Sequence, residues 1–222
     1  MGKIFCFMGK SASGKDTIFN QVSEDYPNIL RITPYTTRPI RDGEIDGIQY
    51  HFVNIETYKR MVDDKEVIEA RNYQTKYGVW TYFTASKNID LNNNYMCINT
   101  LDGYNNLVKF FGEDKVVPIY IEVEDSIRLE RALQREKKEK VPKYCEMCRR
   151  FLADEEDFSL DNLMDANINV RFNNADFVDC IIEIENYINS QMDKDINVLN
   201  KNGKKKANMW ANTYLLFILK VI

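Results

Sequence analysis

The sequence is poor in the residues from which zinc sites and disulfide frameworks are built. It contains a single histidine, His51, and an odd number of cysteines, at positions 6, 97, 145, 148 and 180. Cys145 and Cys148 have the spacing of half a zinc site, but no second cysteine pair completes the ligand set. Several of the cysteines lie in apolar runs, as buried free thiols do. We therefore expect no zinc and a reducing, cytoplasmic compartment.

Long apolar runs are also missing. No stretch reaches the roughly 20 residues that a helix needs to cross a bilayer, including the apolar segment MWANTYLLFILKVI. The N-terminal run IFCFM is short and leads directly into a glycine-rich loop. We therefore expect neither a membrane span nor a secretory leader.

The charge is modest overall but unevenly distributed. The formal net charge is −4, which does not suggest a nucleic-acid binder. Residues 191–222 hold six lysines and two acidic residues, so this part carries +4 and the remainder −8. We expect one acidic folded domain over residues 1–190 and a basic and apolar tail over 191–222. The tail is either a solvated extension, a segment folded back on the domain or a membrane-surface contact.

Apolar runs alternate with helical patterns along most of the chain, which predicts an α/β fold with a parallel sheet flanked by helices. Residues 33–85 interrupt this alternation with short strands, turns and one short helix, and we expect them to form an inserted subdomain. The expected strands of the main sheet are 3–9, 29–33, 95–99, 116–123 and 168–172, and the expected helices are 16–26, 101–111, 126–139, 142–153 and 176–190.

The segment GKSASGKDT is the first candidate site. Gly9, Gly14 and Lys15 have the spacing of a phosphate-binding loop, and the loop joins an apolar strand to a helix, which is the context that the motif needs. Glycines let the backbone N–H groups point inward, the helix start is positive, and the lysine adds a mobile charge. The residues of this candidate ATP-binding site are Gly9, Lys10, Ser11, Ala12, Ser13, Gly14, Lys15, Asp16 and Thr17.

Asp16 departs from the loop pattern, which has serine or threonine at this position to ligate Mg²⁺. A carboxylate beside phosphates is repelled unless a cation lies between them, and carboxylates are good Mg²⁺ ligands. Asp16 is therefore a candidate metal ligand. The alternative is that it only stabilises the positive helix start.

The segment TTRPIRDGEIDGIQYHFV is the second candidate site. Arg38 and Arg41 lie in a loop rather than on a helix, and guanidinium groups bind phosphate as a fork. Tyr50 and Tyr77 are further hydrogen-bond donors. Because the glycine-rich loop already supplies one phosphate site, this cluster indicates a second phosphorylated substrate.

Together these two segments resemble the guanylate kinase family, from about residue 3 to residue 190. The resemblance implies a P-loop kinase that transfers the γ-phosphate of ATP, with Mg²⁺, to a nucleoside monophosphate, most often GMP. Lys15 and the arginines of the lid over residues 131–148 would act on the transferred phosphate. The implied catalytic residues are Lys15, Arg131, Arg135 and Arg150, and the implied acceptor residues are Arg38, Arg41, Glu44, Tyr50, Glu69 and Tyr77.

Within that resemblance Glu69 would accept hydrogen bonds from the guanine N1–H and 2-amino groups, and Glu44 would fix the arginines of the loop. Three departures qualify it. Pro34 stands where the family has serine, Val79 and Trp80 replace a hydroxyl pair, and Asn99 replaces an aspartate near the metal. The base specificity could differ, and an acid lost at one position and gained at Asp16 suggests a relocated metal ligand. The alternatives are a kinase for another phosphorylated acceptor and a binding module without turnover.

Overall fold

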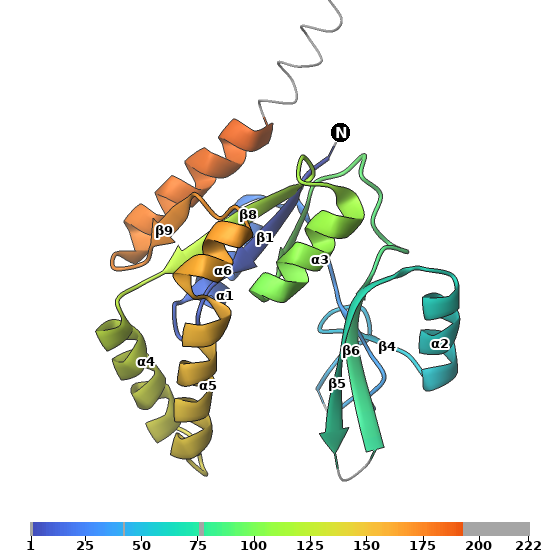
Figure 1. Cartoon of the computed structure of the whole chain (residues 1–222), viewed down its shortest axis with the longest axis horizontal. Helices are drawn as coiled ribbons and strands as arrows, with labels where there is room; N and C mark the ends of the chain where they lie inside the picture. Colours follow the sequence, from blue (N-terminus) through green and yellow to red (C-terminus); the bar gives the residue numbers. More distant parts are fainter. Residues whose placement is uncertain (1, 42, 76–77, 193–222) are drawn as a thin grey trace, which may run out of the picture.

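A parallel sheet flanked by helices forms the upper half of the protein in the view of Figure 1. The structure is a computed structural model and describes residues 2–41, 43–75 and 78–192. The strand order is β2-β7-β1-β8-β9, and every neighbouring pair is parallel. These strands are β1 (Ile4–Met8), β2 (Leu30–Arg31), β7 (Tyr95–Ile98), β8 (Val116–Glu122) and β9 (Arg171–Asn173).

Helices cover both faces of this sheet because its central strands are apolar on both sides. In β1 the side chains of Phe5 and Phe7 join one core cluster, whereas Ile4, Cys6 and Met8 join the other. The first cluster is closed by α1 (Lys15–Asp25) and by a helix over residues 177–192, and the second by α3 (Leu101–Phe111) and α6 (Leu160–Asp165). This confirms the predicted α/β fold.

Two further helices, α4 (Asp125–Lys137) and α5 (Tyr144–Asp157), follow β8 and pack against each other. Both lie within two to four residues of the predicted ranges. Helix α6 was not predicted. Its only local signal is Ser159, whose side chain accepts a hydrogen bond from the Asn162 N–H at 3.4 Å and so caps the helix.

The segment expected to form an inserted subdomain contains a second sheet, with the order β4-β3-β6-β5. Its strands are β3 (Tyr35–Thr36), β4 (His51–Phe52), β5 (Val67–Thr75) and β6 (Gly78–Ala85), and α2 (Ile55–Asp63) packs beside them. Strands β3 and β4 are only two residues long each. Tyr35, Met61, Phe83 and Ala85 give this sheet a small core of its own.

Strand pairing determines which side chains share a face of the second sheet. Strands β5 and β6 are antiparallel, and their register pairs Glu69 with Thr84, Arg71 with Tyr82 and Tyr73 with Trp80. Because side chains alternate along a strand, these six residues lie on one face. In Figure 1, α2 lies beside this second sheet at the lower right, and α4 and α5 lie together at the lower left. Both groups extend from the same side of the parallel sheet.

Among the described residues, no helix is long and apolar enough to cross a membrane. The predicted tail lies outside the described residues, apart from positions 191 and 192.

The central strands should dominate stability. Ile119 is fully buried in β8, so Ile119→Ala should lower the free energy of unfolding by about 2–5 kcal/mol. Val178→Ala, at a residue 61% exposed on the helix over 177–192, should change it by less than about 0.5 kcal/mol. Urea titrations of both variants test this. Equal effects would contradict the placement of Ile119 in the core.

Candidate active site

The glycine-rich loop connects β1 to α1, as predicted. Gly9 has φ 156° and Gly14 has φ 89°, and Gly14 is the N-cap of α1. A Cβ on Gly9 would collide with the carbonyl oxygen of Ile121, and one on Gly14 with the side-chain amide of Asn174. Both glycines are therefore required by backbone conformation and by close packing.

Asn174, directly after β9, ties this loop to two other elements. Its side-chain Nδ2 donates to the Ser13 carbonyl oxygen at 2.7 Å, and its backbone N–H donates to the Glu122 carbonyl oxygen at 2.8 Å. Its own carbonyl oxygen accepts a hydrogen bond from Nη2 of Arg131 at 3.2 Å. Asn174 is buried, so these bonds hold the loop against the sheet and against α4.

The loop also meets two carboxylates from α5. The Ser11 N–H donates to Oδ2 of Asp154 at 2.8 Å, and Nζ of Lys10 lies 2.6 Å from Oε2 of Glu155. Between them lies Arg128 of α4, which is only 1% exposed and pairs with Glu155 at 2.5 Å.

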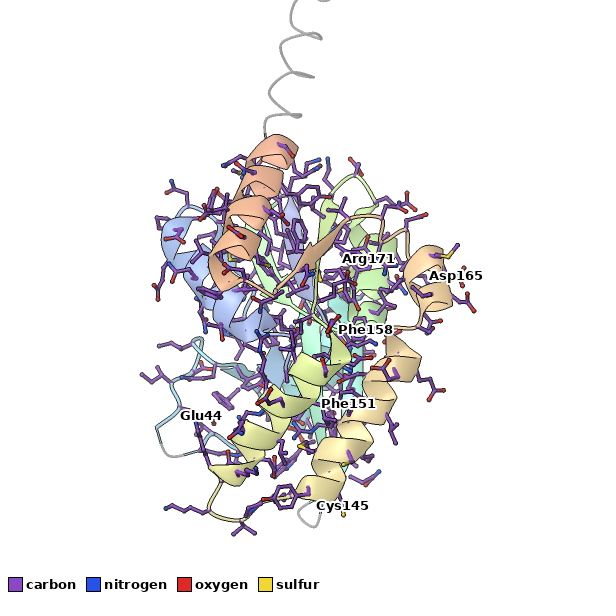
Figure 2. All side chains as sticks on the ribbon, turned by 90° about the vertical axis from the view of Figure 1, so that its left-hand side faces the viewer. Glu44, Cys145, Phe151, Phe158, Asp165 and Arg171 are labelled. Carbon is purple, nitrogen blue, oxygen red and sulfur yellow. The ribbon has the colours of Figure 1, made fainter. Side chains whose placement is uncertain are left out.

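Arg128 has further contacts on the same elements. Its guanidinium lies 4.2 Å from the ring centroid of Phe151, the residue labelled on α5 in Figure 2. It also lies 3.0 Å from Asp125 and 3.5 Å from Asp154. A buried cation surrounded by carboxylates and an aromatic ring fixes α4 and α5 relative to the loop.

Lys15 and Asp16 begin helix α1. Lys15 Nζ lies 3.4 Å from Oδ2 of Asp16, and the Asp16 side chain is 72% exposed. Over the part of the chain that the structure describes, no three histidine, cysteine, aspartate or glutamate side chains gather as a metal site. Mg²⁺ usually takes only one or two carboxylates beside phosphates and water. A single exposed carboxylate at the loop therefore fits such an ion.

The arginine loop is organised by an ion pair. Arg38 donates from Nη1 to Oε2 of Glu44 at 2.7 Å and from Nη2 to Oε1 at 2.5 Å, while the Arg41 N–H donates to Oε2 at 2.8 Å. These bonds to Arg38 and Arg41 lower the pKa of Glu44 to about 2. The pair also raises the pKa of Arg38.

Arg38 is 4% exposed, and its guanidinium lies 5.2 Å from the ring centroids of Tyr50 and Phe52. Its Nε is buried and makes no hydrogen bond to any described residue. Arg41 is exposed and Tyr50 is half-buried. Glu44, labelled in Figure 2, thus fixes one guanidinium inside the loop and orients the backbone of the next. Tyr77, predicted beside them, lies outside the described residues.

A pocket of about 540 Å³ lies between the two sheets. Part of its wall is the face of β5 and β6 that carries Glu69, and Pro34, Tyr50, Ile98 and Asn99 also line it. Oε1 of Glu69 accepts a hydrogen bond from the Thr84 hydroxyl at 2.9 Å. The predicted acceptor residues Tyr50 and Glu69 therefore line one cavity.

The three predicted lid arginines lie on α4 and α5 in different settings. Nη1 of Arg131 lies 3.8 Å from the position that a Cβ on Gly14 would occupy, so Arg131 is beside the glycine-rich loop. Arg135 is exposed one turn further along α4. Arg150 of α5 lies 3.9 Å from the carboxylates of both Glu136 and Glu146. Only Arg131 contacts the loop region in this structure.

A family model described as guanylate kinase matches residues 1–191. The chain belongs to the guanylate kinase family. The guanylate kinase of Zymomonas mobilis is 37% identical over 78 residues, which is 35% of this chain and 36% of that protein. The guanylate kinase of Helicobacter hepaticus is 29% identical over 140 residues, which is 61% of this chain and 68% of that protein.

Among solved structures, the guanylate kinase of Anaplasma phagocytophilum has the same fold, with a TM-score of 0.56 and 19% sequence identity. That match covers 86% of each chain. The alignments with the Zymomonas mobilis protein and with a second bacterial guanylate kinase, from Sphingopyxis alaskensis, each span 36% of the relative's length. The family is therefore shown over residues 1–191, while the chain spans about a third of the length of the Zymomonas mobilis and Sphingopyxis alaskensis relatives.

For this guanylate kinase family member, sequence reasoning found the loops but missed their supports. Arg128, Asp154, Glu155 and Asn174 all contact the glycine-rich loop or its neighbours, and none of them was predicted. Arg128 and Arg131 are three residues apart and so lie on the same side of α4, but their spacing does not say which arginine is buried. Asn174 has no local signal, because its partners are distant in the sequence.

The ion pair at Glu44 should be visible in the pH dependence of stability. A carboxyl whose folded pKa is depressed stabilises the fold above its unfolded pKa of about 4.3, and this contribution is lost as the pH falls towards about 2. Glu44→Gln should lower the melting temperature at pH 7 and flatten its fall between pH 5 and pH 2. Thermal melts of both proteins across this range test it. Parallel curves would contradict the assignment.

Proposed function

We propose that this protein is a guanylate kinase that transfers the γ-phosphate of ATP to GMP, with ADP and GDP as products. The observation that carries the proposal is the pocket beside the arginine loop, because a volume of about 540 Å³ accommodates a nucleotide base and Glu69 lies on its wall. The glycine-rich loop, which we assign to the phosphates of ATP, follows β1 of the parallel sheet.

On the donor side, backbone N–H groups of the loop and the positive start of α1 favour the phosphates of ATP. Lys15 lies at the first position of α1 and adds a charge for the β- and γ-phosphates. The loop is held rigidly by Asn174, so its donors are oriented before the nucleotide binds.

On the acceptor side, Arg38 and Arg41 are assigned to the phosphate of GMP. Nε of Arg38, buried without a hydrogen bond to the described residues, is left to donate to a phosphate oxygen while both terminal nitrogens hold Glu44. Tyr50 lies against this guanidinium and contributes a hydroxyl. Tyr77 is assigned to the same phosphate on the resemblance alone.

The reaction needs no general base, because the acceptor phosphate is already a nucleophile. The protein contributes position and positive charge at the transferred group. We assign α4 and α5 as a lid that brings Arg131, Arg135 and Arg150 to that group, and residues 33–85 as the acceptor-binding subdomain. A binding module without turnover has no use for Lys15 together with these arginines.

Mg²⁺, when bound with ATP, would neutralise charge on the phosphates, and Asp16 is the residue that would hold it.

The exposed free thiols Cys145 and Cys148 suit a reducing compartment, so we assign the reaction to the cytoplasm.

An ADP-release assay with GMP, dGMP, AMP, CMP and UMP tests the function, and turnover should be fastest with GMP. Arg131→Ala should lower kcat by about 100- to 1,000-fold, because it removes positive charge from the transferred group. Arg149→Ala removes an exposed arginine paired with Glu146 on α5, and it should change kcat by less than about twofold. No turnover with any acceptor would refute the kinase assignment, and a best rate with AMP or UMP would refute the preference for GMP.

Asp16→Ala should lower kcat at limiting Mg²⁺ by at least about tenfold and raise the Mg²⁺ concentration for half-maximal rate, because it removes the ligand oxygen. Asp161→Ala is the matched control, since Asp161 is also an acid in the first turn of a helix. It should affect stability only slightly and leave the Mg²⁺ titration unchanged. Identical Mg²⁺ titrations for the wild type and Asp16→Ala would reduce Asp16 to a charge that stabilises the helix start.

A further inference from the structure

Arg71 and Glu69 lie side by side in the wall of the acceptor pocket. They are two residues apart on β5 and so point to the same face of the sheet. Nε of Arg71 lies 3.7 Å from Oε2 of Glu69. A positive donor and a negative acceptor are therefore presented next to each other to whatever occupies the pocket.

These two are the only charged side chains among the described residues that line this pocket. The others are aromatic, apolar or neutral polar, namely Pro34, Tyr50, Tyr73, Trp80, Tyr82, Phe83, Thr84, Ile98 and Asn99. A charged pair in a largely aromatic wall selects a planar ligand with a donor edge beside an acceptor.

Neighbouring residues hold both side chains of the pair. Nη2 of Arg71 donates to the hydroxyl of Thr100, the N-cap of α3, and the Thr84 hydroxyl donates to Oε1 of Glu69. Nη1 of Arg71 makes no hydrogen bond within residues 2–41, 43–75 and 78–192, and its side chain is 34% exposed. The Nη1 amino group of this fixed guanidinium is thus left to donate to a ligand.

We infer that Arg71 recognises the 6-oxo group of the acceptor base while Glu69 accepts from its N1–H and 2-amino groups. The inference rests on the proposed function and names the specificity of the same site. Guanine presents an acceptor oxygen directly beside its N1–H and amino donors, which matches a guanidinium beside a carboxylate. Adenine presents a 6-amino donor beside an unprotonated N1, so each of its groups faces a like partner.

The residues around the pair support this role for Arg71. Pro34 lines the pocket and has no hydroxyl or N–H to offer, and Trp80 takes the position opposite Tyr73. Oδ1 of Asn99 already accepts the Thr100 N–H at 2.9 Å. Its amide nitrogen is the competing donor, and Asn99 directly follows β7 rather than lying on the strand that carries Glu69.

Two acceptor analogues separate the roles of Arg71 and Glu69. In 6-thio-GMP sulfur replaces the 6-oxo group, whereas IMP keeps that oxygen and lacks the 2-amino group. Arg71→Met should lower kcat/KM for GMP by about 10- to 100-fold, mainly through KM. It should also abolish the preference for GMP over 6-thio-GMP and leave the preference over IMP unchanged. Arg71→Lys should restore part of the loss, since it keeps the charge.

Equilibrium binding of GMP without ATP gives a second readout, followed by the fluorescence of Trp80 in the pocket wall. The dissociation constant should rise by the same factor in Arg71→Met. Arg60→Ala, an exposed arginine in the last turn of α2, should change neither readout. Thr100→Val removes the anchor but keeps the guanidinium, so it should weaken the preference for GMP over 6-thio-GMP without abolishing it.

Three results would overturn the inference. One is an unchanged preference for GMP over 6-thio-GMP in a folded Arg71→Met protein. Another is a loss of the preference for GMP over 6-thio-GMP in Asn99→Leu but not in Arg71→Met, because this would assign recognition of the 6-oxo group to the Asn99 amide. The third is a wild type that prefers AMP to GMP. A wild type without any turnover instead refutes the kinase function itself, and the binding measurement then still tests Arg71.

Discussion

The close approach between the glycine-rich loop and Asn174 is the constraint on which the rest of the site depends. Because Gly14 has no side chain, the Asn174 amide reaches the Ser13 carbonyl oxygen, and Arg131 reaches Asn174 in turn. One residue after the last strand thereby connects the loop, β8 and α4. The backbone N–H groups of the loop and Arg131 are consequently parts of one hydrogen-bonded unit rather than independent features.

The segment over residues 33–85, to which we assign acceptor binding, has separate supports. It has its own sheet and its own small core, and its arginine loop is stabilised internally by Arg38 and Glu44. One of its links to the parallel-sheet part is β5, which contacts α3 and carries the bond from Arg71 to Thr100. The glycine-rich loop and the arginine loop are thus each held by contacts within their own part of the domain. Such a division allows a change in their separation without a change in either one.

The sequence was sufficient where a signal is local. The apolar run of β1, the glycine spacing and the helix after Lys15 predict the glycine-rich loop between β1 and α1, and the Pro/Gly-containing segment around Arg38 and Arg41 predicts a loop there. It was insufficient where partners are distant. The contact of Asp154 with Ser11 joins residues that are 143 positions apart in the sequence. The burial of Arg128 depends on how α5 packs. Arg71 has no motif, and its place beside Glu69 follows only from strand register.

The pleat of β5 and β6 also limits how this pocket can change over evolution. Glu69, Arg71 and Tyr73 share a face because they are separated by steps of two, and a β-bulge between Val67 and Glu69 sets which face it is. Point substitutions can therefore alter the side chains of this pocket wall one at a time. Insertion or deletion of a single residue after the bulge would turn the whole set towards the opposite face. The lining of the pocket can thus change by point substitution but not by a change in the length of the strand.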